Sequence, residues 1–197
     1  MLATPIDPTA AIASAVAAYR DTNDIAALLE SLAAVVNAAD PEALIGAVEP
    51  YRDIPEVAGP VYERIVRERP TNARALVILA NAYWLAGRGP DVVGDLATRA
   101  MAADPDHRGA WHLWALTEPD LRARVTRWGQ VCERFPEDDL ARAALADNAA
   151  SLASTERDRE ALQIALRTYR ALLRTARHPE QRQALESAVS TLERWTL

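Results

Sequence analysis

The sequence predicts an all-α protein built from antiparallel helix pairs, and three observations lead to this prediction. Alanine is abundant, whereas the 197 residues include only 7 glycines, a balance that favours helices over tight β-turns. No segment alternates apolar and polar residues as a half-buried strand would. The 12 prolines punctuate the chain, often after aspartate, as they do at the first turn of a helix.

Asp-Pro pairs and apolar periodicity together place the expected helices. Asp7-Pro8, Asp40-Pro41, Asp104-Pro105 and Phe135-Pro136 are interpreted as boundaries. Pro60 falls inside one predicted helix and is expected to kink or restart it. The short connections between helices favour antiparallel neighbours. About eleven helices are predicted, near residues 8–19, 23–38, 41–50, 55–68, 72–86, 90–103, 108–117, 119–134, 138–152, 156–177 and 179–195.

One stretch has the order of large, small and turn residues of a helix-turn-helix repeat. In residues 71–105 this order is Leu76, Leu79, Ala80, Ala82, Tyr83, Gly87, Ala97, Ala100 and Pro105. Pro70, Pro105 and Pro136 close successive units that are 35 and 31 residues long. The chain therefore resembles the tetratricopeptide repeat (TPR) family, whose period is about 34 residues, over about residues 55–177.

The resemblance implies a single all-α domain over residues 1–197, in which helix pairs stack into a right-handed, TPR-like superhelix, an α-solenoid. Residues 1–53 are expected to be helical, although they match no repeat. Residues 179–195 are expected to form a solvated C-terminal cap. The first helix of each pair would line a concave groove, and the family as a whole binds peptides or helices of other proteins.

The groove positions of the family fall on a mostly apolar set of residues in this sequence. They are Arg74, Val77, Ile78, Asn81, Trp84, Leu85, His112, Leu113, Leu116, Leu140, Ala143, Asp147 and Ala150. The predicted function is a protein-interaction scaffold that holds a partner helix or peptide. Alternatively, the chain's own terminal helices fill the groove, or a second copy does so in a structural homo-oligomer.

Three further predictions concern the ligand of the groove and the positions of the tryptophans. Chaperone-binding members of the family hold a terminal carboxylate with basic and amide side chains, but of those positions only Asn81 matches here, so such a clamp is not expected. Trp111, Trp114 and Trp128 are expected in the core. Trp84 is expected on the groove wall, either as a binding anchor or packed against the next helix pair.

Composition and charge exclude several kinds of partner and chemistry. All 22 basic residues are arginine, as in proteins of GC-rich bacterial genomes, so reactions that need a lysine are excluded. The net charge is −6, which disfavours nonspecific nucleic-acid binding. Cys132 is the sole cysteine, and the short apolar stretch near the N-terminus is neither a signal peptide nor a membrane span. A cytoplasmic protein is therefore expected.

No set of residues predicts an enzyme, a cofactor or a metal site. His107 and His112 lack the spacing of a helical zinc site. Cys132 and His112 could form a nucleophile–base pair, but a buried, inert thiol is favoured. A small helical enzyme is the least favoured alternative. Arg167, Arg170, Arg174 and Arg177 form one helical stripe that would bind an acidic partner or, as we favour, serve as a solvated face.

Overall fold

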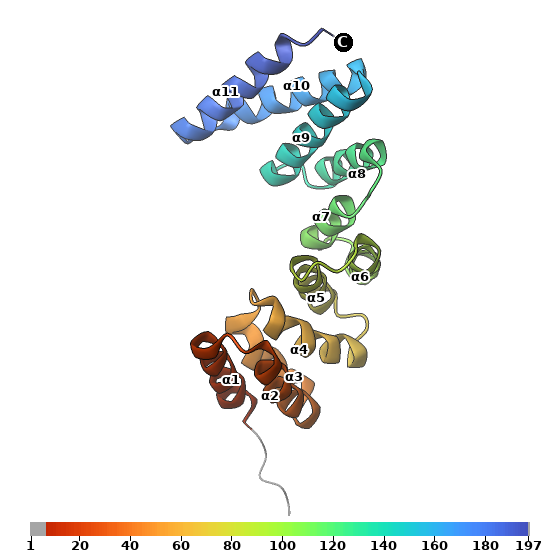
Figure 1. Ribbon diagram of the computed structural model, residues 1–197. Coiled ribbons are helices and arrows are strands. Elements are labelled where there is room, and N and C mark those ends of the chain that lie inside the picture. The colour runs from red at the N-terminus through yellow and green to blue at the C-terminus, as the bar shows by residue number, and fades with distance from the viewer. Residues whose placement is uncertain (1–6, 197) are drawn as a thin grey trace, which may run out of the picture. The chain divides into compact units, whose positions relative to one another are not determined.

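The chain is helical along its length in a computed structural model, which describes residues 7–196 (Figure 1). Within these residues there are eleven α-helices, one 3-10 turn and no β-strand, as predicted. The helices are α1 (Pro8–Thr22), α2 (Ile25–Ala38), α3 (Pro41–Val48), α4 (Pro55–Glu68), α5 (Ala73–Leu85), α6 (Pro90–Ala103), α7 (Arg108–Leu116), α8 (Leu121–Arg134), α9 (Asp139–Glu156), α10 (Arg159–Thr175) and α11 (Pro179–Glu193). The 3-10 turn, η1 (Glu49–Tyr51), follows α3 directly.

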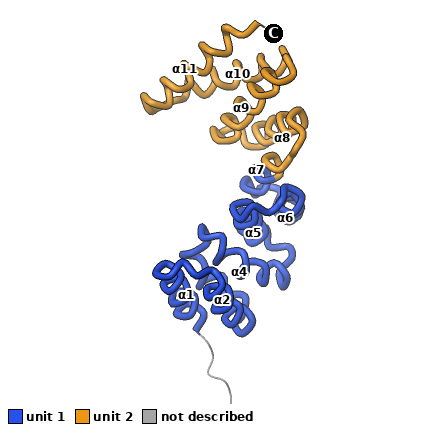
Figure 2. Tube along the Cα trace, viewed as in Figure 1, with its two compact units in different colours: residues 1–113 blue, residues 114–197 orange. Residues whose placement is uncertain are grey.

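The helices divide into two compact units, residues 1–113 and residues 114–197 (Figure 2). Unit 1 contains α1 to α6 and the first part of α7. Unit 2 contains the end of α7 and α8 to α11. Each unit is described separately below.

Aspartate side chains explain why many of the helices begin where they do. Asp7 and Asp40 accept hydrogen bonds from the amides of Thr9 and Glu42, each with proline at the next position. These caps satisfy amides that have no partner within the helix. The other two predicted boundaries need correction, because Asp104 and Phe135 end α6 and α8 rather than begin the next helix.

In unit 1 the helices pack as successive pairs. α1 packs against α2 and α3, and α2 and α3 both pack against α4; α5 then packs against α4 and α6. The pattern extends the helix pairing to residues 1–53, for which no repeat register was predicted. The core of these pairs consists of fully buried side chains, among which the largest are Tyr62, Ile12, Leu28, Leu32, Leu44, Ile65 and Leu76.

The prediction that Pro60 would restart its helix is wrong. α4 runs from Pro55 to Glu68 with Pro60 inside it. Proline normally disfavours the helical conformation of the preceding residue, partly through a clash with that residue's Cβ. The preceding residue here is Gly59, which has no Cβ, so this part of the cost is absent, although the backbone bond that Pro60 cannot donate is still lost.

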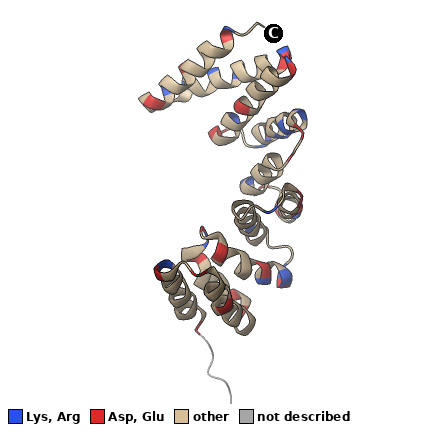
Figure 3. Cartoon of the chain, viewed as in Figure 1, with Lys and Arg blue, Asp and Glu red and all other residues tan. Residues whose placement is uncertain are grey.

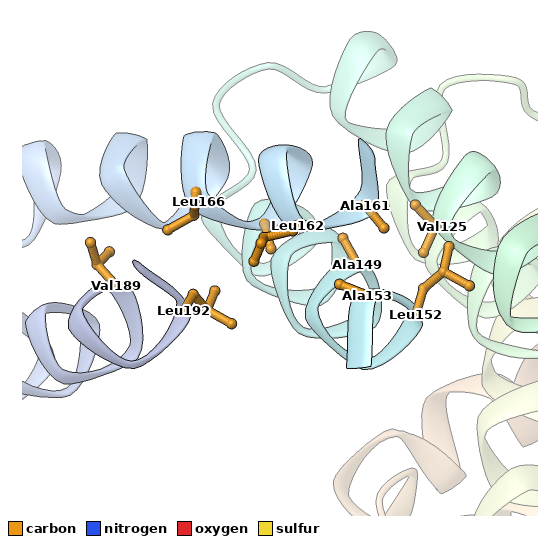
Figure 4. Close-up of a cluster of buried hydrophobic side chains, with 10 residues drawn as sticks. Val125, Ala149, Leu152, Ala153, Ala161, Leu162, Leu166, Val189 and Leu192 are labelled. Carbon is orange, nitrogen blue, oxygen red and sulfur yellow. The ribbon is translucent and has the colours of Figure 1, made fainter. Parts of the chain in front are cut away.

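The core of unit 2 joins its last four helices. Val125 of α8, Leu152 of α9, Leu162 of α10 and Leu192 of α11 belong to one buried cluster (Figure 4). Small residues allow these helices to approach closely, since Ala149, Ala153 and Ala165 are fully buried in the same cluster. α11 adds Val189 and Leu192 to the cluster while most of its other residues are exposed.

The three tryptophans assigned to the core do not behave alike. Trp128 is buried, as predicted. Trp111 and Trp114 are only partly buried, and each has a contact with a polar group. The indole N–H of Trp111 donates to the carbonyl of Pro105 at 2.8 Å. The guanidinium of Arg127 lies 4.5 Å from the centre of the Trp114 ring, which is a cation–π distance.

Candidate functional site

Helix α5 of unit 1 carries the central stripe of the predicted groove, and both of its ends are fixed by local sequence. At its start, the side chain of Asn72 accepts a hydrogen bond from the amide of Ala75 at 3.0 Å. At its end, Gly87 has a φ of 73°, which glycine adopts without steric cost. The amides of Gly87 and Arg88 bond back to the carbonyls of Trp84 and Tyr83, which is the Schellman pattern.

The outward face of α5 lines a cavity of about 570 Å³. Every groove position predicted on this helix contributes to the cavity wall: Arg74, Val77, Ile78, Asn81, Trp84 and Leu85. They recur every three or four residues and therefore share one face of the helix. The opposite face is occupied by the core, where Leu76, Leu79 and Ala80 are buried.

The remaining walls of the cavity come from other segments of unit 1. Arg52 and Asp53 follow the turn η1, and His107 precedes α7. Gly109 permits a close approach at this place, because a Cβ added there would lie 3.3 Å from Cγ1 of Val77. The N-terminal region therefore supplies one wall of the cavity, and sequence reasoning missed Arg52 and Asp53 because they belong to residues that matched no repeat.

Four side chains of α5 that line the cavity are exposed, namely Arg74, Asn81, Trp84 and Leu85. The exposed fractions are 38% for Trp84 and 67% for Leu85, which are high values for large apolar side chains. Asn81 is exposed and lies between the polar start of the helix and these two residues. A partner that covered this surface would bury apolar area and meet an amide able both to donate and to accept hydrogen bonds.

The predicted groove positions on α7 differ from one another. Leu113 is buried, with 4% of its surface exposed, and Val77 on α5 is similarly buried with 7%, so neither offers much free surface to a partner. Helix α7 buries Ala110 and Leu113 on one face. His112 is partly buried. Leu116, in the part of α7 that belongs to unit 2, is 38% exposed.

In unit 2 the predicted groove residue Asp147 already has a hydrogen-bond partner within the chain. The carboxylate of Asp147 on α9 accepts a hydrogen bond from the Tyr169 hydroxyl of α10. Burial, followed by this hydrogen bond and the charge of Asp147, raises the pKa of Tyr169. Ala143 and Ala150 are partly buried and Leu140 is exposed. Asp147 therefore ties α9 to α10.

A second and larger cavity of unit 1, of about 780 Å³, lies among α4, α5 and α6. Its wall is rich in charged groups of both signs, including Glu63, Arg67, Asp91, Asp95 and Arg99. The hydroxyl of Tyr83 donates to Glu63 at 2.7 Å there, and burial together with this bond raises the pKa of Tyr83 to about 12. Since it lacks an exposed aromatic anchor, this cavity is a weaker candidate for a partner site.

The residues considered for catalysis or metal binding do not form a reactive group. Burial raises the pKa of the Cys132 thiol to about 11, and a thiol that stays protonated is a poor nucleophile. Among residues 7–196, no three or more His, Cys, Asp or Glu side chains are grouped to hold a metal ion. No helix in that range is both long and apolar enough to cross a membrane.

The predicted arginine stripe lies on the surface of unit 2, but only its first three members belong to α10, because this helix ends at Thr175, before Arg177. Arg167, Arg170, Arg174 and Arg177 are all exposed, and Arg170 pairs with Glu193 of α11 at 2.7 Å. Arginines and carboxylates are interspersed along the helices of this unit (Figure 3). An exposed pair of this kind contributes little to stability.

Comparison with known proteins identifies the architecture. No protein-family model and no curated protein matches the sequence. Among solved structures, the MamA protein is similar with a TM-score of 0.60 and 17% identity, over 88% of this chain and 99% of that one. TTC0263, a thermophilic TPR protein of Thermus thermophilus, has a TM-score of 0.56 and 18% identity, over 93% of this chain and 99% of that one. At these identities the likeness concerns the fold, and the chain has a TPR-like helical repeat fold.

Proposed function

We propose that this TPR-like protein is an interaction scaffold that holds a segment of another protein in the α5 cavity. The observation that carries the proposal is the pair of exposed apolar side chains, Trp84 and Leu85, at the edge of that cavity. Large apolar side chains gain free energy when a partner removes them from water. Tryptophan in particular is enriched among the residues that dominate binding energy.

The proposed mechanism is passive and needs no cofactor. The backbone of α5 is fixed at both ends by its caps, so the binding face is formed before the partner arrives and little ordering cost is added. Asn81 would set the register of the partner by hydrogen bonding. We further propose that His112, Leu116, Ala143 and Asp147 play at most a supporting role, and that the protein works in the cytoplasm.

Differential capture tests the proposal. Immobilised wild-type protein and the double variant Trp84→Ala, Leu85→Ala are exposed to a lysate of the source organism, and retained proteins are identified by mass spectrometry. The double variant Ile25→Ala, Leu29→Ala is the matched control, since it removes two exposed apolar side chains from α2. We expect a protein that is retained by the wild type and the control and is lost with the α5 variant.

The same variants distinguish partner binding from self-association. The mass of each protein is measured by light scattering over a range of concentrations. A wild type whose mass rises with concentration, with the rise abolished only in the α5 variant, would assign the surface to a homo-oligomer instead. If capture and mass are the same for all three proteins, the proposal is wrong.

A further inference from the structure

At one end of the α5 cavity, two arginines that line it are paired with the same carboxylate. Glu49 of η1 accepts from both through the same oxygen, Oε1, which lies 2.9 Å from Nη1 of Arg52 and 2.6 Å from Nη2 of Arg74. Arg52 and Arg74 line the cavity, whereas Glu49 is not part of its wall. This end of the cavity therefore presents two guanidinium groups, and two carboxylates lie beside them, Glu49 outside the wall and Asp53 within it.

This internal carboxylate is held weakly enough to be exchanged. The exposed fractions of the side chains are 39% for Glu49, 48% for Arg52 and 59% for Arg74, and ion pairs in such contact with water contribute little to stability. A guanidinium has five N–H donors, of which each arginine directs only one nitrogen to Glu49. Nε of Arg52 also lies 3.8 Å from Oδ1 of Asp53, so a partner's carboxylate would use the remaining nitrogens of the two groups.

A buried phenol lies within the electrostatic field of Glu49 and the two arginines. The hydroxyl of Tyr62 is buried and has no hydrogen-bond partner, and Tyr62 is 2% exposed. Its pKa is raised by burial and by the charge of Glu49, and is lowered by the charges of Arg74 and Arg52. The field of these three groups therefore reaches the core of unit 1.

The other end of the cavity is apolar. Trp84 follows Arg74 by ten residues on the same helix, which corresponds to about 15 Å along the axis. Asn81 lies between them and presents an amide. An extended peptide has free backbone N–H and C=O groups for such an amide, whereas a helix has satisfied its own. An extended chain covers about 15 Å in four or five residues.

We propose that the cavity takes an extended, acidic segment of the partner, whose side-chain carboxylate binds Arg52 and Arg74 in place of Glu49 while a large apolar side chain four or five residues away covers Trp84 and Leu85. This inference rests on the proposed function and specifies the chemistry of the partner. It does not involve the family's carboxylate-clamp positions, which carry no cation in this chain.

The distant carboxylates of unit 1 do not prevent a carboxylate from binding the two arginines. Residues 1–113 carry 9 arginines and 15 carboxylates, but charges in physiological salt are screened over about 8 Å, so the distant acids slow the approach more than they weaken the final contact. Asp53 lies within that distance, with Oδ1 3.8 Å from Nε of Arg52, and it competes with the incoming carboxylate for Arg52.

Arrays of synthetic peptides test the inference with the full-length protein. Each peptide is acetylated and amidated and carries one glutamate and one phenylalanine in a serine–alanine background, separated by two to eight residues in either order. A second array has glutamine in place of glutamate. For the wild type we expect about tenfold tighter binding to glutamate peptides than to their glutamine partners, since hydrogen bonds to charged groups are the stronger ones. The difference should be greatest at a separation of four or five residues.

Four variants separate the contributions of the two ends. Arg74→Gln should abolish the preference for glutamate and keep the binding that phenylalanine provides, and Arg52→Gln should reduce the same preference. Glu49→Gln should strengthen binding of glutamate peptides, because the arginines lose their internal competitor. Trp84→Ala should weaken both arrays equally. Thermal unfolding of each variant checks that it folds.

The outcomes distinguish this inference from the proposed function. Equal binding of the glutamate and glutamine arrays by the wild type, with both weakened by Trp84→Ala, would overturn the acidic preference and leave the α5 site in place. Binding to neither array, or binding that Trp84→Ala does not change, would count against the site itself.

Discussion

Helices α5 and α9 are the first helices of two helix pairs, and the structure uses their predicted groove faces differently. In unit 1 the face of α5 lines a cavity and leaves Asn81, Trp84 and Leu85 exposed. In unit 2 the carboxylate of Asp147 on α9 is occupied by the Tyr169 hydroxyl of α10. The comparison shows that a position in a repeat register does not decide whether a side chain stays exposed or bonds to a neighbouring helix. What decides it is whether the adjacent helix supplies a group that reaches the position.

The largest expected effect concerns the core of unit 2 and tests whether α9 is mainly structural. Leu152 is 2% exposed in the cluster of α8 to α11, so Leu152→Ala should lower the free energy of unfolding by about 2–5 kcal/mol. Leu140→Ala makes the same substitution at an exposed position of the same helix. It should change the free energy of unfolding by less than about 0.5 kcal/mol. Chemical denaturation measures both. A similar cost for the two variants would contradict the burial pattern.

The next effect concerns Asn81 and tests whether α5 provides hydrogen bonds to the partner. Asn81→Ala should weaken binding of the captured partner by about threefold to tenfold, as expected for a hydrogen bond worth about 0.5–1.5 kcal/mol. Asn37→Ala makes the same change at an exposed position of α2 and should leave affinity unchanged. Titration calorimetry provides the measurement, and equal affinities of the two variants would remove Asn81 from the site.

Replacing Asp147 should have an effect of similar size in free energy, but on stability and not on partner binding. Asp147→Ala removes the acceptor of the Tyr169 hydroxyl and should cost about 1 kcal/mol of stability. Tyr169→Phe should cost a similar amount, and the double variant little more than either one. Partner affinity should not change. Additive costs in the three proteins would show that the bond between α9 and α10 contributes nothing.

The smallest effect is a pH dependence of stability that both units should share. In each unit a tyrosine hydroxyl donates a hydrogen bond to a carboxylate of a neighbouring helix. The pKa of Tyr83 is about 12 in the folded state, above the value near 10 of an exposed phenol. The unfolded chain therefore loses this proton first, so Tyr83 reduces stability as the pH rises from about 10 to 12. In denaturation curves over that interval, Tyr83→Phe should show a shallower decline than the wild type. An unchanged slope would mean that Tyr83 titrates normally.

Most of the fold could be predicted because its signals are local. Asp7 and Asp40 cap the helices whose starts they indicated, and Gly87 adopts the left-handed conformation expected of a turn residue. Pro60 was misjudged because the effect of a proline depends on the residue before it, and Gly59 relieves the clash. Asp104 and Phe135 were assigned to the wrong side of their boundaries because proline is tolerated both inside a helix start and in the turn before one.

The candidate site could be predicted only in part, because its walls come from several segments. The α5 positions follow from the resemblance to the TPR repeat. Arg52, Asp53 and His107 reach the cavity through tertiary packing that no repeat pattern encodes. The burial of Leu113 and the engagement of Asp147 by Tyr169 likewise depend on neighbouring helices. Arg52 would have been recognisable only if the helix pairing of residues 1–53 had been known.

The central claim is that a partner binds on α5 and not on α9, and hydrogen–deuterium exchange of the full chain tests it most directly. Exchange is compared with and without the captured partner. We predict slower exchange in peptides that cover residues 49–53 and 73–87, and no change in residues 139–156. Protection of residues 139–156 with none in 73–87 would contradict the claim and assign the partner to the unit that we consider structural.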